Sequence, residues 1–193
     1  MIAYEVDLVT PAGQTVYCGR LALTAPDSHG RYRAEFAYDH SYLEWPQCFA
    51  LDPISLPLGP APVQAQQLYP PLAIFEDALP DRWGRRLMDQ LHQLPAKQRC
   101  EPVYLGLLGD AGLGALRFRG LQSAPEPAKP MAASATLDEL LEASAAFERH
   151  EWTSTPALEH LLRAGRTPGG ARPKALLNVG QEAWLAKFPQ CGA

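Results

Sequence analysis

Apolar and polar residues alternate over short stretches in the first two thirds of the chain, a pattern that predicts β-strands. Two of these stretches flank the turn sequence Pro-Ala-Gly-Gln at 11–14, so we expect them to pair as a hairpin. Another, at 55–58, contains a proline, which favours a short strand at the edge of a sheet. The segments that predict strands here are 6–9, 16–23, 33–38, 55–58 and 115–118.

Helical periodicity follows Asp81, whose side chain is suited to cap a helix N-terminus. We expect a helix over 82–94, because apolar residues recur on one face and Pro95 then ends the pattern. That face consists of Trp83, Leu87, Leu91 and Leu94. A second, short helix is predicted at 102–108.

The segment 123–133 is rich in proline and alanine and has Met131 as its one large apolar residue. It predicts a semi-rigid linker between two domains. The expected fold class is α+β. A small β-rich N-terminal subdomain with a few helices is predicted for 1–122, and two helices followed by a β-hairpin are predicted for 134–193.

After the linker, Thr136 and Glu139 match the Ser/Thr-x-x-Glu pattern of a capping box, which predicts a helix over 137–147. Its expected apolar stripe is Leu137, Leu140, Leu141 and Phe147. Thr155 is expected to cap a second helix that Gly165 ends.

Charge and composition narrow the class of protein. The 193 residues carry a net charge of −4, so no global basic field favours DNA or RNA. No apolar run approaches the roughly 18 residues of a membrane span, and the N-terminus lacks the basic segment of a signal peptide. We therefore expect a cytoplasmic protein with no direct contact to nucleic acid or membrane. The four cysteines are widely separated, which favours reduced thiols and predicts no metal site.

The strongest chemical signal is a basic loop with paired glycines at 165–174 that leads into an apolar strand. A second strand, 184–189, carries Lys187, and between 163 and 187 five basic residues accompany one acid, Glu182. Glycines let backbone N–H groups converge on phosphate oxygens, and a lysine from a neighbouring strand adds a point charge. The pattern indicates a phosphate site, although it is not a Walker loop. A solvated basic turn is the alternative.

A second glycine-rich run, 106–115, leads from a helix into a strand, whereas a dinucleotide-binding loop leads from a strand into a helix. We expect it to be a structural turn that needs a positive φ angle. Asp77, Asp81 and Asp110 form no recognisable catalytic pair, and no motif supplies a general base.

Several segments, taken together in order and spacing, resemble the HipA family of bacterial toxin kinases. The segments are GRL at 19–21, FAYD at 36–39, YL at 42–43, PISLPL at 53–58, FEDALPD at 75–81, LLGDAGLGAL at 107–116, GGARPKA at 169–175 and WLAKFP at 184–189. The resemblance spans essentially the whole chain.

This resemblance implies a serine/threonine kinase that uses ATP and Mg²⁺, with a β-rich N-terminal subdomain, a kinase N-lobe and a helical C-lobe. Family members phosphorylate aminoacyl-tRNA synthetases, which stalls translation and favours dormancy. They usually pair with HipB, a helix-turn-helix antitoxin that binds operator DNA. A HipB-like antitoxin is therefore the partner that the resemblance implies, and a synthetase is the implied substrate.

The resemblance also assigns roles to residues of the basic loop. The implied nucleotide-binding residues are Gly169, Gly170, Ala171, Arg172, Lys174 and Lys187. Family members autophosphorylate on serines just before the two glycines, where this chain retains a hydroxyl at Thr167. A phosphate on Thr167 would oppose closure of the ATP site through its added negative charge.

The family's catalytic and metal-binding aspartates follow the lysine strand, and the 193 residues do not include them. We therefore expect no kinase activity from this chain alone and assign no catalytic or metal-binding residue. The alternative function is a non-catalytic module that restrains a partner kinase, since some related systems carry the N-terminal subdomain as a separate protein. Residues 1–122 would suffice for that role, whereas a phosphate loop would have no use in it.

Overall fold

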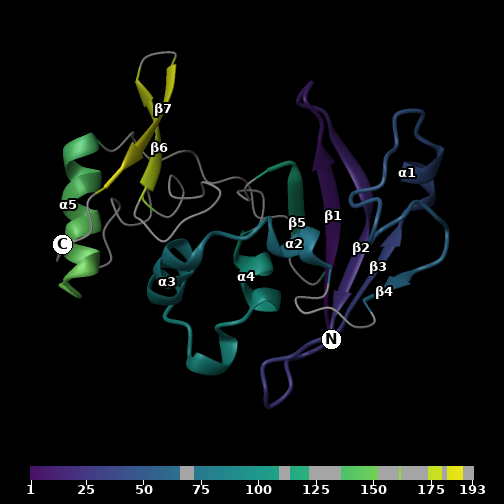
Figure 1. Ribbon diagram of the computed structural model, residues 1–193, viewed down its shortest axis with the longest axis horizontal. Helices are drawn as coiled ribbons and strands as arrows, with labels where there is room; N and C mark the ends of the chain where they lie inside the picture. Colours follow the sequence, from purple (N-terminus) through teal and green to yellow (C-terminus); the bar gives the residue numbers. More distant parts are fainter. Residues whose placement is uncertain are drawn as a thin grey trace. The chain divides into compact units, whose positions relative to one another are not determined.

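The computed structural model describes residues 1–65, 72–108, 114–121, 136–151, 161, 174–179 and 182–188. Its internal contacts divide the chain into two compact units. The first unit comprises Met1–Leu79 and Cys100–Glu126, and the second comprises Pro80–Arg99 and Pro127–Ala193. The fold is α+β, as expected, with a five-stranded sheet in the first unit and a two-stranded sheet in the second (Figure 1).

The sheet of the first unit is antiparallel, with strand order β4-β3-β2-β1-β5 (Figure 1). Its strands are β1 (Ile2–Val9), β2 (Thr15–Leu23), β3 (Ala34–Tyr38), β4 (Val63–Gln64) and β5 (Leu116–Gly120). The predicted hairpin is confirmed as β1 and β2. Val6 and Leu8 point into the core, because alternate side chains of a strand lie on the same face.

Three helices pack on the core face of this sheet: α1 (His40–Glu44), α2 (Ala73–Glu76) and α4 (Glu101–Leu108). Tyr42 of α1 stacks on Tyr38 of β3, with ring centroids 5.7 Å apart. Phe75 of α2 lies 5.3 Å from Phe36 by the same measure. Aromatic rings therefore connect the helices to the sheet, and α4 confirms the helix predicted at 102–108.

Tyr4 fixes α4 against β1. Its hydroxyl donates a hydrogen bond of 2.6 Å to the carbonyl oxygen of Pro102, and burial raises the pKa of Tyr4 to about 12. Gly106 leaves room for the ring, since a Cβ there would lie 2.6 Å from the Tyr4 hydroxyl oxygen. The positive φ angle expected in the run 106–115 is found at Gly114, where φ is 73°.

Charged side chains occupy the opposite face of the sheet. Asp7 is only 5% exposed, and its carboxylate accepts two hydrogen bonds from Arg119, of 2.8 and 3.2 Å. Arg119 also lies 3.2 Å from the carboxylate of Glu5, its direct partner across the β1–β5 ladder. This group of three side chains satisfies a buried negative charge within the sheet.

A β-bulge lies beside this charged group. The register of β1 and β2 shifts between Val6 and Asp7, which leaves Cys18 without a partner in the ladder. The next residue, Gly19, runs so close to β3 that an added Cβ would overlap the carbonyl oxygen of Ala37. The GRL segment at 19–21 therefore begins with glycine for a steric reason.

The prediction of an edge strand at 55–58 is wrong. This segment forms part of a turn, in which the Leu56 N–H donates to the Asp52 carbonyl oxygen at 2.8 Å and the Ser55 hydroxyl donates to the Asp52 carboxylate. An aspartate that bonds its own neighbourhood competes with a strand ladder. Strand β4, five residues further on, forms the edge of the sheet instead.

The second unit contains α3 (Arg82–Leu91) and α5 (Leu137–Glu148), and both predicted N-caps are confirmed. Asp81 accepts a hydrogen bond from the Gly84 N–H, and Thr136 and Glu139 form the reciprocal capping box. Helix α3 ends three residues earlier than predicted. His92 caps it and Gln93 adopts a φ angle of 49°, which is incompatible with helix continuation.

Helices α3 and α5 pack against each other through polar as well as aromatic contacts. The Trp83 Nε1–H donates a hydrogen bond of 2.8 Å to Glu148, and the Trp83 ring meets Phe147 edge-on with centroids 5.9 Å apart. Arg86 lies 3.6 Å from the Glu148 carboxylate and 5.3 Å from the centre of the Phe147 ring. Helix α3 is thus held by a helix that lies beyond the predicted linker.

The apolar stripe predicted for α5 is wrong in two of its four positions. Leu140 and Phe147 are buried, whereas Leu137 and Leu141 are 51% and 43% exposed. Ser144 is buried in their place, so the inward face contains a hydroxyl that the apolar pattern did not include.

Other predictions fall partly or wholly on residues outside those described. They include the linker at 123–133 and, apart from the buried Leu161, the helix expected between Thr155 and Gly165. The short 3₁₀ helix η1 (Ala96–Gln98) connects α3 to α4. Among the helices that the structure describes, none has the length and apolar character needed to span a membrane.

Candidate functional site

The predicted C-terminal strands form an antiparallel hairpin of β6 (Lys174–Val179) and β7 (Glu182–Lys187) (Figure 1). The ladder runs from Val179 opposite Glu182, next to the turn, to Lys174 opposite Lys187 at the open end. β7 therefore begins two residues before the predicted segment 184–189 and ends at Lys187.

The register places Lys174 and Lys187 directly opposite each other, which the sequence analysis did not anticipate. Opposite residues of an antiparallel pair belong to the same face of the sheet, and like charges at such positions are destabilising. Lys187 is exposed, and the next residue, Phe188, is 4% exposed. Two of the six residues implied for nucleotide binding are thus brought together.

The remaining residues of the predicted site are Thr167, Gly169, Gly170, Ala171 and Arg172, and they lie outside the described residues. Of the predicted site, the described residues therefore include only the opposed lysine pair, which follows the glycine-bearing loop in sequence.

The described residues offer few other groups for catalysis. No three His, Cys, Asp or Glu side chains among them are arranged to hold a metal ion. Cys18, Cys48 and Cys100 are free thiols, and burial raises the pKa of Cys18 to about 12, which suppresses the reactive thiolate. The buried carboxylate of Asp7 is bound by Arg119, so its role is to hold the sheet together.

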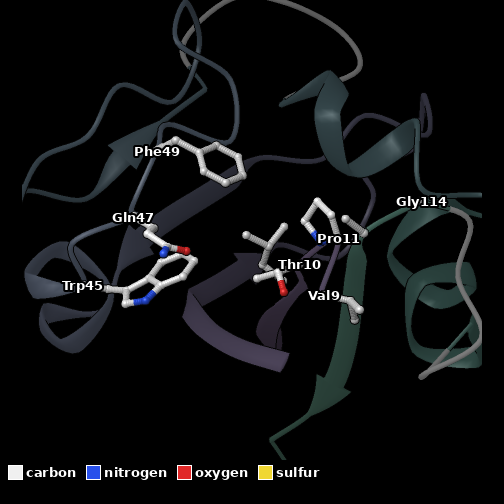
Figure 2. Close-up of a pocket in the computed structure, with 9 residues that line it drawn as sticks. Val9, Thr10, Pro11, Trp45, Gln47, Phe49 and Gly114 are labelled. Atoms are coloured by element: carbon white, nitrogen blue, oxygen red, sulfur yellow. The ribbon is translucent and has the colours of Figure 1, made fainter. Parts of the chain in front are cut away.

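A pocket of about 520 Å³ opens in the first unit, at the end of the sheet where β1 finishes and β5 begins (Figure 2). Val9, Thr10 and Pro11 form one wall, and Trp45, Gln47 and Phe49 form another. Leu8 of β1 and the pair Gly114 and Ala115, where the chain enters β5, complete the lining. No sequence pattern predicts this pocket, because its residues come from three segments that only the fold brings together.

The pocket walls are held by hydrogen bonds from the sheet and from α1. The Tyr42 hydroxyl donates to the Phe49 carbonyl oxygen at 2.9 Å, and the Val9 N–H donates to the Ala115 carbonyl oxygen at 2.7 Å. Tyr42 also contacts the Trp45 ring, with centroids 5.9 Å apart. The pocket is therefore formed before any ligand arrives.

Comparison with known proteins identifies the family. The family model described as the HipA N-terminal domain matches residues 15–119, just over half of the chain. A search of curated proteins gave no match. The matched region runs from β2 into β5 and includes the bulge at Cys18, the pocket wall from Trp45 to Phe49, and helix α3. The chain belongs to the HipA family, through its N-terminal domain.

Proposed function

We propose that this chain supplies the N-terminal subdomain and the phosphate-binding hairpin of a HipA-like serine/threonine kinase. Membership of the family supports the first part of this proposal. The opposed lysines at the open end of the β6–β7 hairpin support the second, and they are the observation that carries it.

The energetics of the lysine pair favour an anion between the two side chains. Like charges in direct cross-strand positions cost about 0.2–1 kcal/mol, so the hairpin alone gains nothing from this arrangement. A polyphosphate between the two lysines would turn the repulsion into two attractive contacts. The glycine-bearing loop at 165–173 comes immediately before Lys174, where backbone N–H groups would reach the same phosphates.

In this function Gly169, Gly170, Ala171 and Arg172 cover the phosphates of ATP, and Lys174 and Lys187 bind them. Mg²⁺ accompanies the nucleotide, and Thr167 is the candidate for regulatory phosphorylation. The wider role is that of a toxin of a type II toxin–antitoxin system in the cytoplasm. A HipB-like antitoxin is then the partner and an aminoacyl-tRNA synthetase the substrate.

Calorimetric titration of the 193-residue chain with ATP and Mg²⁺ tests the phosphate site. Lys187→Ala should weaken binding by about tenfold or more, which corresponds to about 1.4 kcal/mol. Lys97→Ala is the matched control, because Lys97 is an exposed lysine of the second unit that lies in η1, outside the hairpin. Equal affinities for the wild type and both variants would remove the basis for the proposal.

A second experiment addresses the toxin–antitoxin role. The chain and a HipB-like antitoxin encoded beside it would be produced together, and their complex measured by size-exclusion chromatography with light scattering. A stable complex supports the proposed partner. Separate elution at micromolar concentration argues against it, whatever the outcome of the ATP titration.

A further inference from the structure

The pocket of the first unit has a chemistry opposite to that of the lysine hairpin. None of its nine lining residues carries a charge, and its volume of about 520 Å³ falls within the range of small-molecule sites, roughly 300–1,000 Å³. A phosphate, carboxylate or ammonium group entering it would lose hydration and gain no ionic partner. The ligand that fits is therefore uncharged.

Two walls of different character face each other across the pocket (Figure 2). Trp45 and Phe49 present aromatic rings on one side, and Val9 and Pro11 present aliphatic groups on the other. Phe49 is 50% exposed although it is a large apolar residue, and its backbone is fixed by the Tyr42 hydroxyl. Such walls favour a flat ring, because every aromatic heterocycle can stack by its face.

Polar groups lie between these walls. Gln47 points its amide toward the space between Trp45 and Phe49, and this amide has no hydrogen-bond partner among the described residues (Figure 2). Thr10 contributes a hydroxyl whose oxygen accepts a bond of 3.1 Å from the Gln14 N–H. A glutamine amide offers one donor and one acceptor side by side, and it pairs with a ring edge that has the same arrangement, as in adenine.

We propose that this pocket binds an uncharged heteroaromatic ring with a donor–acceptor edge, the chemistry of a nucleobase. The ring stacks against Trp45 and Phe49, and its edge bonds the amide of Gln47. This site is separate from the phosphate site of the hairpin, and it depends on neither lysine. The same ring chemistry exists in a free nucleoside and in an unpaired base of single-stranded nucleic acid.

The test uses adenosine, which has the base but no phosphate, with the full 193-residue chain labelled with ¹⁵N. The indole N–H signal of Trp45, assigned by its loss in Trp45→Phe, should shift in a saturable manner. Phe49→Ala and Gln47→Ala should each raise the dissociation constant by about tenfold or more. Ile54→Ala should not, because Ile54 is an exposed apolar residue of the same loop that does not line the pocket.

Additional experiments distinguish the pocket from the phosphate site and a free nucleoside from an unpaired base of nucleic acid. Tripolyphosphate, which carries the charges of ATP but no base, should leave the Trp45 signal unshifted, which distinguishes this pocket from the proposed phosphate site. A short single-stranded oligoadenylate that competes with adenosine would identify an unpaired base as a second source. The proposal is overturned if adenosine up to its solubility limit leaves the Trp45 signal in place. It is equally overturned if Phe49→Ala and Gln47→Ala bind adenosine as tightly as the wild type.

Discussion

The two sheets of this protein treat cross-strand charges in opposite ways. In the first, Arg119 of β5 bonds Asp7 and Glu5 of β1, so each charge has an opposite neighbour. In the second, Lys174 and Lys187 occupy the same rung of the ladder with no acid opposite either of them. The first arrangement stabilises the fold, whereas the second lowers the stability of its own hairpin. A destabilising pair in an otherwise regular ladder is the feature on which the proposed anion site rests.

The largest effect is expected from removing Arg119 from its ion pairs with Asp7 and Glu5. Arg119→Ala leaves the Asp7 carboxylate buried without its partner and should lower the free energy of unfolding by about 2–3 kcal/mol. This is below the cost of breaking a fully buried pair, because the Arg119 side chain is 48% exposed. Urea denaturation measures the change, with Arg31→Ala as an exposed control. A loss no greater than that of the control contradicts this account of the sheet.

Alkaline pH should affect the first sheet through Tyr4. Burial raises the pKa of the folded tyrosine to about 12, from 10.0 as its ordinary value, so the folded state holds the proton more tightly. The resulting stability is fully present below pH 10 and is lost as pH rises through 12, by about 2.7 kcal/mol. Urea denaturation at several pH values measures this slope. Tyr4→Phe should show a smaller slope, and an unchanged slope would mean that other groups are responsible.

The Lys174–Lys187 pair should instead make the stability of the protein depend on a bound anion. ATP at ten times its dissociation constant should raise the free energy of unfolding by about 1.4 kcal/mol through binding to the folded state. Thermal denaturation with and without the nucleotide measures this stabilisation, and Arg119→Ala should retain it. Stabilisation of Lys187→Ala to the same extent would contradict the role given to the lysine pair.

The smallest and most discriminating effect is expected from Lys187→Glu. This change places a carboxylate opposite Lys174 and should stabilise the hairpin by a few tenths of a kcal/mol, as opposite charges do on one rung. It should abolish ATP binding at the same time. Hydrogen exchange of the β6–β7 amides and calorimetry measure the two effects. Slower exchange together with loss of ATP binding would support the view that the lysine pair lowers the stability of the hairpin and is needed for ATP binding.

Features set by neighbouring residues could be predicted from the sequence. The β1–β2 hairpin, the caps at Asp81 and Thr136 and helix α4 each follow from residues within a few positions of one another. The end of α3 and the turn at Asp52 could not, because a positive φ at Gln93 and the hydrogen bonds of the Asp52 carboxylate to Ile54 N–H and the Ser55 hydroxyl overrode the apolar pattern.

Features set by distant residues were out of reach. The pocket joins the end of β1, the segment after α1 and the start of β5. The lysines were predicted as site residues, but their direct opposition depends on the register of the hairpin. Leu137 and Leu141 were wrongly predicted to lie on the buried face of α5. Apolar periodicity alone does not specify which positions of a helix contact its neighbour.

The packing of α3 on α5 has a consequence for how the protein is made. Trp83 leaves the ribosome 65 residues ahead of Glu148, its hydrogen-bond acceptor. At about 5–20 residues per second, the interval between them is roughly 3–13 s. During those seconds the sheet of the first unit can form, while Trp83 lacks its contacts to α5. Nascent chains halted before residue 137 should therefore be bound by chaperones, and chains halted after α5 has emerged should be released.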